Sequence, residues 1–262
     1  MILVKIIKYQ LHDVMRSKWI IFYTAFYFIV IYGMLTFTND ISKVLLSLMN
    51  VVLIIIPLIS TILGTIYFYN NRDYIVFMLS QPINRTTIFL GLYFGLAIPL
   101  ILSFVVGVVL GIVVYSSSLQ NYFGILLLIM LSGIFLTVIF TAISFWTSIK
   151  NEDRLKGFGA AIFIWLFLAL LFDGILLFLI QALQDYPLET FSLVVSMLNP
   201  IDLARVLILL KFDIAALMGY TGAVFQKFFG NTTGMLISFT VLTVWAAAPL
   251  FFARKKFLKK DF

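Results

Sequence analysis

The sequence predicts an all-α integral membrane protein with six transmembrane helices. Of its 262 residues, 63% are hydrophobic and only 11% are charged, whereas roughly a quarter of a soluble domain is charged. The mean hydropathy is +1.13. One bilayer crossing needs about 20 mostly apolar residues. Six stretches reach about that length, at residues 19–37, 44–68, 88–115, 122–149, 158–181 and 234–252.

Residues 1–18, before the first span, predict an amphipathic helix that lies in the membrane surface. Charged or polar side chains and aliphatic side chains recur at helical spacing on two separate stripes. The polar stripe holds Lys5, Lys8, His12 and Arg16, and the apolar stripe holds Val4, Ile7, Leu11 and Val14. The alternative is a cytoplasmic end that only follows the positive-inside tendency. That alternative explains the charges but not the apolar stripe.

The basic residues predict that both chain ends are cytoplasmic. With the N-terminus inside, only four of the 18 Lys and Arg residues fall outside, namely Lys43, Arg205, Lys211 and Lys227. Such an excess on one side marks the cytoplasmic face. No small-x-small cleavage pattern follows residues 19–37, so we expect that stretch to remain as a span. We therefore expect a single transmembrane domain over residues 1–262.

Residues 70–87 form a polar-ended insert between the second and third spans. Arg72, Asp73 and Arg85 lie near its ends, its middle is apolar, and Pro82 prevents one continuous helix into the next span. The pattern predicts a short surface helix followed by a turn. A second charged loop, residues 150–156, falls on the same side. Both loops are predicted to face a cytoplasmic partner.

The connection between the fifth and sixth spans, residues 182–233, is long enough for structure of its own. Pro200 suits the first position of a helix, and Asp202 and Arg205 can then pair at i, i+3. We expect at least two short extracytoplasmic helices here. They are too apolar to stand free in water, so they should pack on the spans.

The sequence lacks the parts of an enzyme. It has one histidine and no cysteine, which excludes a multi-histidine or thiolate metal site and a histidine-based nucleophile within the spans. No G-x-x-x-x-G-K-[ST] motif occurs, so the chain is not expected to bind ATP through a P-loop. The net charge of +7 is explained by membrane topology, and no nucleic-acid partner is expected.

Asp173 is the only ionisable residue well inside a predicted span. An unpaired charge there costs about 2.5 to 3.5 kcal/mol on insertion scales. One hypothesis places Asp173 at an interface or an outward-opening cavity. The alternatives are a hydrogen bond to a neighbouring helix or a position near the outer water boundary.

This arrangement resembles the membrane subunit of an ABC-2 type (type V) ABC transporter. Residues 79–85, Leu-Ser-Gln-Pro-Ile-Asn-Arg, and the later Phe89-Leu90-Gly91 resemble the coupling-helix region of that family, although Asn70-Asn71-Arg72-Asp73 and Leu92 depart from it. The resemblance implies an elbow helix at residues 1–18, a coupling loop at residues 70–87 and a homodimer in the bacterial inner membrane. It also implies a non-catalytic chain without cofactor or metal, because ATP and Mg belong to separate ATPase subunits. The residues expected to contact those subunits are Arg72, Asp73, Phe77, Met78, Gln81, Pro82, Arg85, Glu152 and Arg154.

Within the family, residues 199–207 resemble the Asn-Pro-x-Asp-x-x-Arg segment of permeases from NosDFY-type systems, which mature nitrous oxide reductase. This resemblance implies a NosF-like ATPase, a periplasmic β-helical NosD-like partner and a role in assembling the copper site (CuZ), with copper or sulfur as cargo. Asn199, Pro200, Asp202 and Arg205 are then expected to serve the periplasmic partner. The alternatives are an exporter of a lipid, drug or ion, and a membrane scaffold that transports nothing.

Overall fold

The computed structural model describes residues 2–38, 40–115, 122–182, 194–212 and 232–261, and this part of the chain is helical with no strand. The predicted all-α class is confirmed. The helices are α1 (Ile2–Met15), α2 (Lys18–Phe37), α3 (Ile41–Asn70), α4 (Arg72–Leu79), α5 (Arg85–Tyr115), α6 (Phe123–Lys150), α7 (Arg154–Leu166), α8 (Phe172–Ala182), α10 (Pro200–Leu209) and α12 (Thr232–Lys259). A π-helical turn, η2 (Phe167–Leu171), joins α7 to α8, and a 3₁₀ turn, η3 (Leu210–Phe212), follows α10.

Within the described residues, six helical segments are long and apolar enough to cross a membrane, as predicted. They are Lys18–Phe37, Ile41–Asn70, Arg85–Val114, Phe123–Lys150, Arg154–Leu179 and Thr233–Lys259. Three begin three or four residues before the predicted apolar stretches, and an aspartate caps two of these starts. Asp40 accepts from the backbone N–H of Ser42 at 3.1 Å and Asp153 from that of Leu155 at 2.8 Å. Such caps satisfy backbone donors at a helix start and extend it beyond the apolar run.

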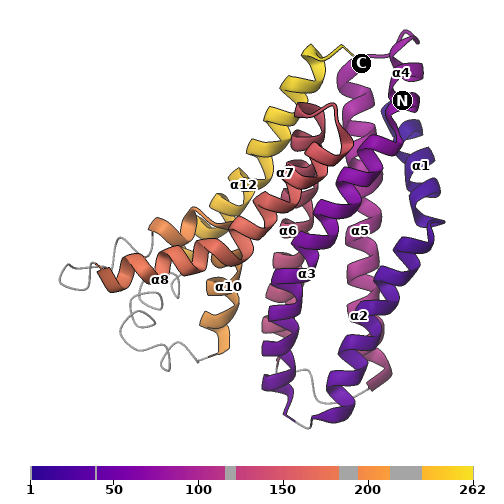
Figure 1. The fold of residues 1–262 in the computed structure, drawn as a ribbon. Coiled ribbons are helices and arrows are strands. Elements are labelled where there is room, and N and C mark those ends of the chain that lie inside the picture. Colours follow the sequence, from indigo (N-terminus) through magenta and orange to yellow (C-terminus); the bar gives the residue numbers. More distant parts are fainter. Residues whose placement is uncertain (1, 39, 116–121, 183–193, 213–231, 262) are drawn as a thin grey trace.

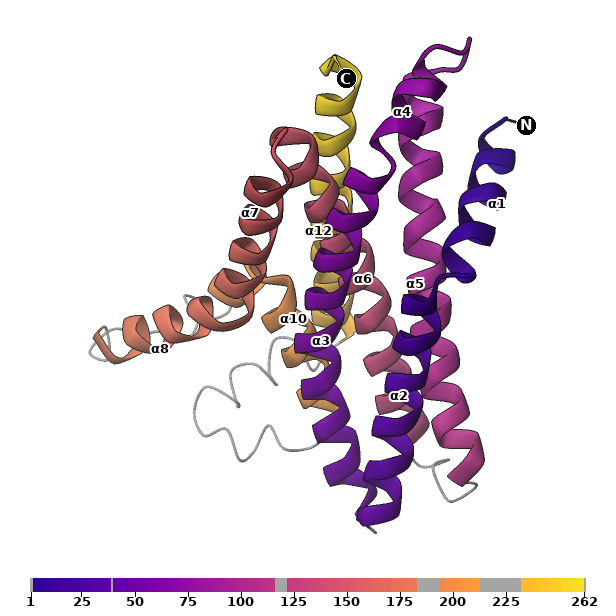
Figure 2. The ribbon, with the colours of Figure 1, turned by 45° about the vertical axis from the view of Figure 1, so that its right-hand side comes forward.

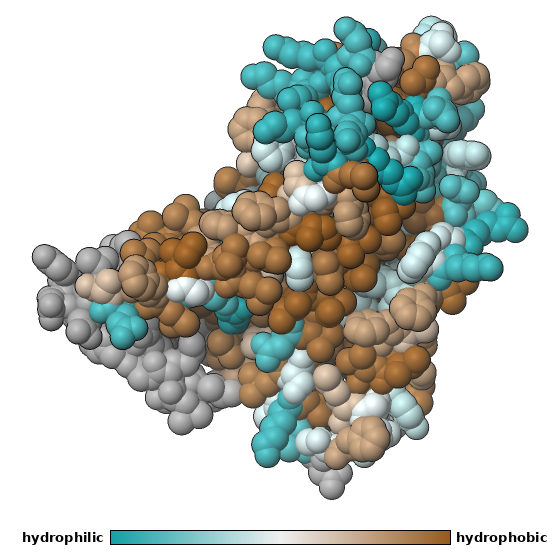
Figure 3. Space-filling view, in the orientation of Figure 1, coloured by the Kyte–Doolittle hydropathy of each residue, from teal (hydrophilic) through white to brown (hydrophobic). Residues whose placement is uncertain are grey.

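One end of the bundle gathers the charged segments. The N-terminus, α4, the α6–α7 connection and the C-terminal end of α12 all lie there (Figure 1), and the same end is the most hydrophilic part of the visible surface (Figure 3). We call this end, made of α1, α4, the start of α5, residues 150–154 and the last turns of α12, the basic end. Below it, the side-chain surface is largely apolar (Figure 3).

The first helix packs on a side offset from the predicted apolar stripe. Ile6, Gln10 and Val14 are buried, whereas Val4 is 66% exposed, so Val14 alone of the predicted residues is fully covered. The physical reason is the partner: Ile6 lies over Gly91 and Gln10 over Gly95 of α5. Side chains at these glycines would occupy the same space. The close approach therefore selects the stripe that meets them.

The fifth span is bent rather than straight. The sequence pattern predicted one stretch over residues 158–181, but η2 interrupts it, and α8 leaves the bundle in a different direction from α7 (Figures 1 and 2). A π-helical turn adds a residue to one turn and redirects the helix, and such turns recur at functional sites. Periodicity alone does not reveal it.

Below the basic end, a cluster of aromatic side chains packs α3, α5, α6 and α12 against one another. Phe145 of α6 lies 5.4 Å from Phe68 of α3 and 6.2 Å from Phe89 of α5, measured between ring centroids. Phe89 in turn lies 5.4 Å from Phe257 of α12. Phe89, Phe145 and Phe257 are fully buried. The cluster therefore joins α3, α5, α6 and α12 into one packed unit.

Candidate functional site

Helix α4 has one face on the bundle and one face open. Ile75 is completely buried, and Tyr74 stacks on Tyr9 of α1 with ring centroids 6.2 Å apart. On the other side Val76 is exposed and Phe77 is 61% exposed. The predicted short helix and following turn are present, because α4 ends at Leu79 and a turn containing Pro82 leads into α5.

Most of the residues predicted to contact an ATPase are on the surface. Met78 is partly buried against the core, and Arg85 is partly buried. The exposed ones are Arg72, Asp73, Phe77, Gln81, Pro82, Glu152 and Arg154.

Arg85 connects the turn after α4 to the C-terminal segment. Its Nη1 donates to the carbonyl oxygens of Leu258 at 3.2 Å and Lys260 at 2.9 Å, and Nη2 lies 4.0 Å from the Asp261 carboxylate. Leu258 lies in the last turn of α12 and Lys260 directly follows the helix, where backbone acceptors lack helical partners. Arg85 therefore has a bonding role inside the chain in addition to the predicted one. No local pattern indicates this role, because the partners are more than 170 residues away.

Tyr69 and Lys260 make further hydrogen bonds between segments of the basic end. The Tyr69 hydroxyl at the end of α3 donates to the carbonyl oxygens of Asn151 at 2.9 Å and Asp153 at 3.2 Å, between α6 and α7. Lys260 Nζ donates to the carbonyl of Ile149 at 2.8 Å. The segments around α4 are thus bonded to α6, α7 and α12. We call these bonds of Tyr69, Arg85 and Lys260 the basic-end ties.

A second polar network joins α8 to α10. Arg205 Nη1 donates to Asp173 Oδ2 at 2.7 Å and to Asp202 Oδ1 at 2.9 Å. Asn199 Nδ2 donates to Asp202 Oδ2 at 3.0 Å and to the carbonyl of Leu168 in η2 at 2.7 Å. The predicted i, i+3 pair is confirmed, and Asp173 has a neighbouring helix as its partner. We call these four residues the Asp173–Arg205 network.

The network sits on a buried helix. Ile201, Leu203 and Ala204 of α10 are fully buried, as is Asn199, and Pro200 occupies the first helical position as predicted. Asn199 also caps the helix by accepting from the Ile201 N–H at 3.0 Å. Helix α10 therefore packs on the spans, as expected for this connection. The second short helix predicted between residues 182 and 233 falls outside the described residues, which omit 183–193 and 213–231.

Comparison with known proteins supports a transporter subunit. No family model matches the chain. Its sequence is 24% identical, over 267 aligned positions, to the probable ABC transporter permease protein NosY of Pseudomonas aeruginosa, and the alignment covers 96% of each chain. The chain is NosY-like. The predicted resemblance to an ABC transporter permease is thereby confirmed, and the similarity extends over all six candidate spans rather than over one local motif.

In this NosY-like chain, the carboxyl of Asp202 has an unusual environment. Burial raises its pKa to about 7, and the adjacent Asp173 carboxyl adds to the rise, while the Arg205 guanidinium and the Asn199 amide oppose it. An ordinary aspartate titrates near pKa 4. Asp202 therefore holds its proton in the folded chain to a much higher pH than in the unfolded chain.

We expect thermal stability to fall as pH rises through this range. Because the folded pKa of Asp202 is raised, the stability that its proton contributes is fully present below about pH 4 and is lost as pH rises through about 7. Asp202→Asn, which mimics the protonated carboxyl, should flatten the fall. Thermal unfolding is measured for both purified proteins at pH 5 and pH 8. Between these pH values the midpoint of the wild type should fall by at least about 2 °C more than that of Asp202→Asn. Asp40→Asn, at an exposed cap, should retain the wild-type profile, and an identical profile for Asp202→Asn would contradict the expectation.

Proposed function

We propose that this chain is the membrane subunit of an ABC transporter, and that it couples ATP hydrolysis on separate ATPase subunits to a periplasmic event in copper-site (CuZ) maturation of nitrous oxide reductase. The observation that carries the proposal is the end-to-end similarity to NosY. Six candidate spans and the absence of a P-loop motif from the sequence are consistent with a membrane subunit powered by another chain. In this proposal the chain itself carries out no bond chemistry.

The proposed orientation puts the basic end in the cytoplasm of a bacterial inner membrane. Cytoplasmic flanks of spans carry an excess of Lys and Arg, and this end holds both termini together with both charged loops. The ATPase subunits, NosF-like, would then bind the open face of α4 and the exposed residues Glu152 and Arg154. Phe77 and Val76 provide the apolar centre of that contact, and such exposed apolar groups ringed by charge favour a protein partner.

The basic-end ties support a mechanical route from α4 into the spans. Movement of α4 pulls on the Arg85 bonds to the end of α12 and on the Tyr69 bonds to the α6–α7 connection. The aromatic cluster resists separation of α3, α5, α6 and α12, so these helices move together. The fifth span, bent at η2, lies beside this unit. A bent span held by a small number of polar bonds is the kind of element that can adopt two arrangements.

The output of the proposed cycle is the region of α8 and α10. The Asp173–Arg205 network links η2, α8 and α10, so a change in the bend at η2 alters the position of α10. A periplasmic β-helical partner, NosD-like, would respond on that side, with two copies of the chain forming a homodimer. Asn199 and Asp202 face inward, so in this proposal they position α10 rather than contact the partner directly.

Co-purification tests the ATPase contact. Phe77→Ala combined with Arg72→Glu should reduce the amount of ATPase subunit recovered with the tagged chain by at least about tenfold, because both residues lie on the open face of α4. Phe37→Ala is a matched control, because Phe37 is also an exposed phenylalanine. It is the last residue of α2, at the end of the bundle far from α4 (Figure 1). Unchanged recovery of the ATPase with the double variant would refute this role for α4.

A deletion strain separates maturation from export. If the chain serves copper-site maturation, nitrous oxide reductase purified from cells lacking it should contain protein but no CuZ absorption, and the wild-type gene should restore it. A complete CuZ centre in the deletion strain would overturn the maturation role and favour the exporter alternative.

A further inference from the structure

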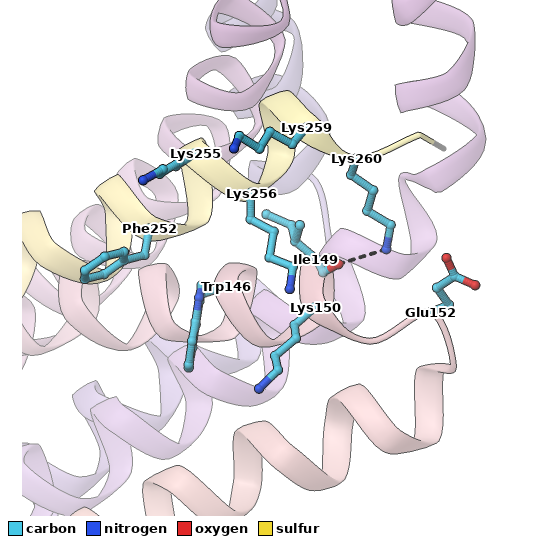
Figure 4. A pocket seen from close by; sticks show the side chains of 9 residues that line it. All are labelled: Trp146, Ile149, Lys150, Glu152, Phe252, Lys255, Lys256, Lys259 and Lys260. Atoms are coloured by element: carbon cyan, nitrogen blue, oxygen red, sulfur yellow. Dashed lines mark hydrogen bonds between the residues drawn. The ribbon is translucent and has the colours of Figure 1, made fainter.

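A pocket rich in lysine lies between the ends of α6 and α12. Its volume is about 480 Å³, and its lining contains five lysines and a single acid, Glu152. The lysines are Lys150, Lys255, Lys256, Lys259 and Lys260. Figure 4 shows Lys256 reaching toward the end of α6, where Lys150 and Ile149 lie. So many like charges around one space favour an anion there.

Four of the pocket's lysines, Lys150, Lys255, Lys256 and Lys259, form no ion pair with a carboxylate within the described residues. Lys150 Nζ lies 5.6 Å from the ring centroid of Trp146, and Lys260 donates to a backbone carbonyl. Burial lowers the pKa of Lys260, Glu152 raises it, and the cations Arg72 and Lys256 lower it further. An anion bound among these lysines would relieve their mutual repulsion.

An apolar groove continues from the lysine pocket toward the centre of the bundle. Its volume is about 810 Å³, and Trp146 and Phe252 line both the groove and the lysine pocket. Phe163 and Phe167 form one wall, and Val244 and Trp245 of α12 form the other. Trp146 and Phe252 thus stand where a charged region meets an apolar one, as aromatic residues do at a membrane interface.

The groove is about as long as the acyl-chain region of one membrane leaflet is thick. It runs along α12 from Val241 to Phe252, a helical rise of about 16 Å at roughly 1.5 Å per residue. Half of a bilayer's hydrocarbon core is about 15 Å thick. The groove is also open: Phe163, Val244 and Phe252 are all exposed, and only 11% of the apolar stretch in each of the fifth and sixth spans is buried within the chain.

We propose that the lysine pocket and the apolar groove together bind one anionic phospholipid. The phosphate lies among Lys150, Lys255 and Lys256, and an acyl chain lies between α7 and α12. Basic pockets between membrane helices at the cytoplasmic side suit such headgroups. The lipid would fill the space between α12 and the bent fifth span, so it would support the arrangement of both. This inference goes beyond the proposed function and does not depend on which ATPase or periplasmic partner the chain has.

A phospholipid fits the two cavities better than a protein partner. A second copy of this chain, meeting it across a two-fold axis at this site, would bring two lysine clusters together, and like charges in contact are unfavourable. An acidic protein could meet the lysines but would not enter the groove within the hydrocarbon layer. One molecule with an anionic head and an apolar chain matches both cavities and their connection.

Lipid titration of the full purified chain tests the proposal. Binding is followed in detergent by native mass spectrometry, with phosphatidylglycerol as the anionic probe and phosphatidylcholine of the same chain length as the neutral one. Phosphatidylglycerol should bind more tightly, and Lys255→Ala with Lys256→Ala should weaken its binding about 25-fold, at about fivefold per lysine. Lys5→Ala with Lys8→Ala removes the same charge from α1, away from the pocket, and should leave binding nearly unchanged.

A second variant tests the groove. Val244→Trp places a large ring where the acyl chain would lie and should weaken binding of phosphatidylglycerol, whereas Ile29→Trp on the exposed side of α2 should not. Equal affinity for the two lipids would overturn the proposal, as would equal loss in the Lys5 and Lys8 control. Loss of dimer or of ATPase recovery in the Lys255 and Lys256 variant, with lipid binding retained, would assign the pocket to a protein contact instead. Failure here leaves the α4 result intact, because the two experiments measure different ligands.

Discussion

Arg205→Met is expected to lower the free energy of unfolding by about 3 kcal/mol. At pH 8, above the raised pKa of Asp202, its carboxyl is ionised, and removing the partner of such a buried charge typically costs roughly 3–5 kcal/mol. Among the described residues, Arg205 is the only cation that pairs with Asp202. The side chain of Asp202 is 6% exposed. We take the lower end of that range because Asp173 and Arg205 retain about a third of their exposure. Thermal unfolding of the purified chain, followed by size-exclusion fluorescence, should show the loss.

The exposed pair Lys43–Asp40 provides the control. It has the same i, i+3 spacing, at 3.4 Å, but its side chains are 77% and 45% exposed. Exposed pairs contribute about 0 to 1 kcal/mol, so Lys43→Met should change stability little. Adding Asp202→Asn to Arg205→Met should recover part of the loss, because it removes a buried charge. Equal effects of Arg205→Met and Lys43→Met would show that the Asp173–Arg205 network is energetically a surface feature.

The sequence predicted the features that depend on local pattern. Apolar length located all six candidate spans, because the bilayer demands about 20 residues for each. Pro82 predicted the end of α4, and Pro200 predicted the start of α10. The Asp202–Arg205 spacing predicted their ion pair, since i and i+3 share a helical face. Each of these follows from the chain within a few residues of the feature.

Features that depend on distant residues were not predictable in the same way. The bonds from Arg85 to the carbonyls of Leu258 and Lys260 require two segments to meet at the basic end. The pairing of Asp173 with Arg205 joins two helices, so the sequence left several partners open. The bend at η2 lies in an unbroken apolar run without proline. The side of α1 that packs on the bundle is set by glycines on α5, which the pattern within α1 does not reveal.

Gly64→Val is expected to disrupt the contact between α3 and α6 and to cost about 3 kcal/mol. A Cβ at Gly64 would clash with Ser144 Oγ and lie 2.9 Å from Ser144 Cβ. Ser144 is fully buried, and its hydroxyl donates to the carbonyl of Thr141 at 2.8 Å. Small residues at such seams allow membrane helices to approach closely, and overpacking usually costs about 1–3 kcal/mol. Gly33→Val is the matched control, because a Cβ at Gly33 meets nothing within 4 Å.

A rescue variant tests whether the close contact between α3 and α6 at Gly64 and Ser144 causes the loss of stability. Ser144→Gly opens the space that a side chain at residue 64 would need, so Gly64→Val with Ser144→Gly should be more stable than Gly64→Val alone, and the difference measures the coupling of the two positions. If the helices act as one unit beneath α4, the single variant should also lose ATPase recovery, since α3 carries Tyr69 and α6 leads into the segment that accepts its hydrogen bonds. If Gly64→Val loses stability but keeps full ATPase recovery and ATP-driven coupling, the packing of α3 on α6 is not needed to transmit movement from α4. The Tyr69 bonds would then carry the movement without the α3–α6 contact.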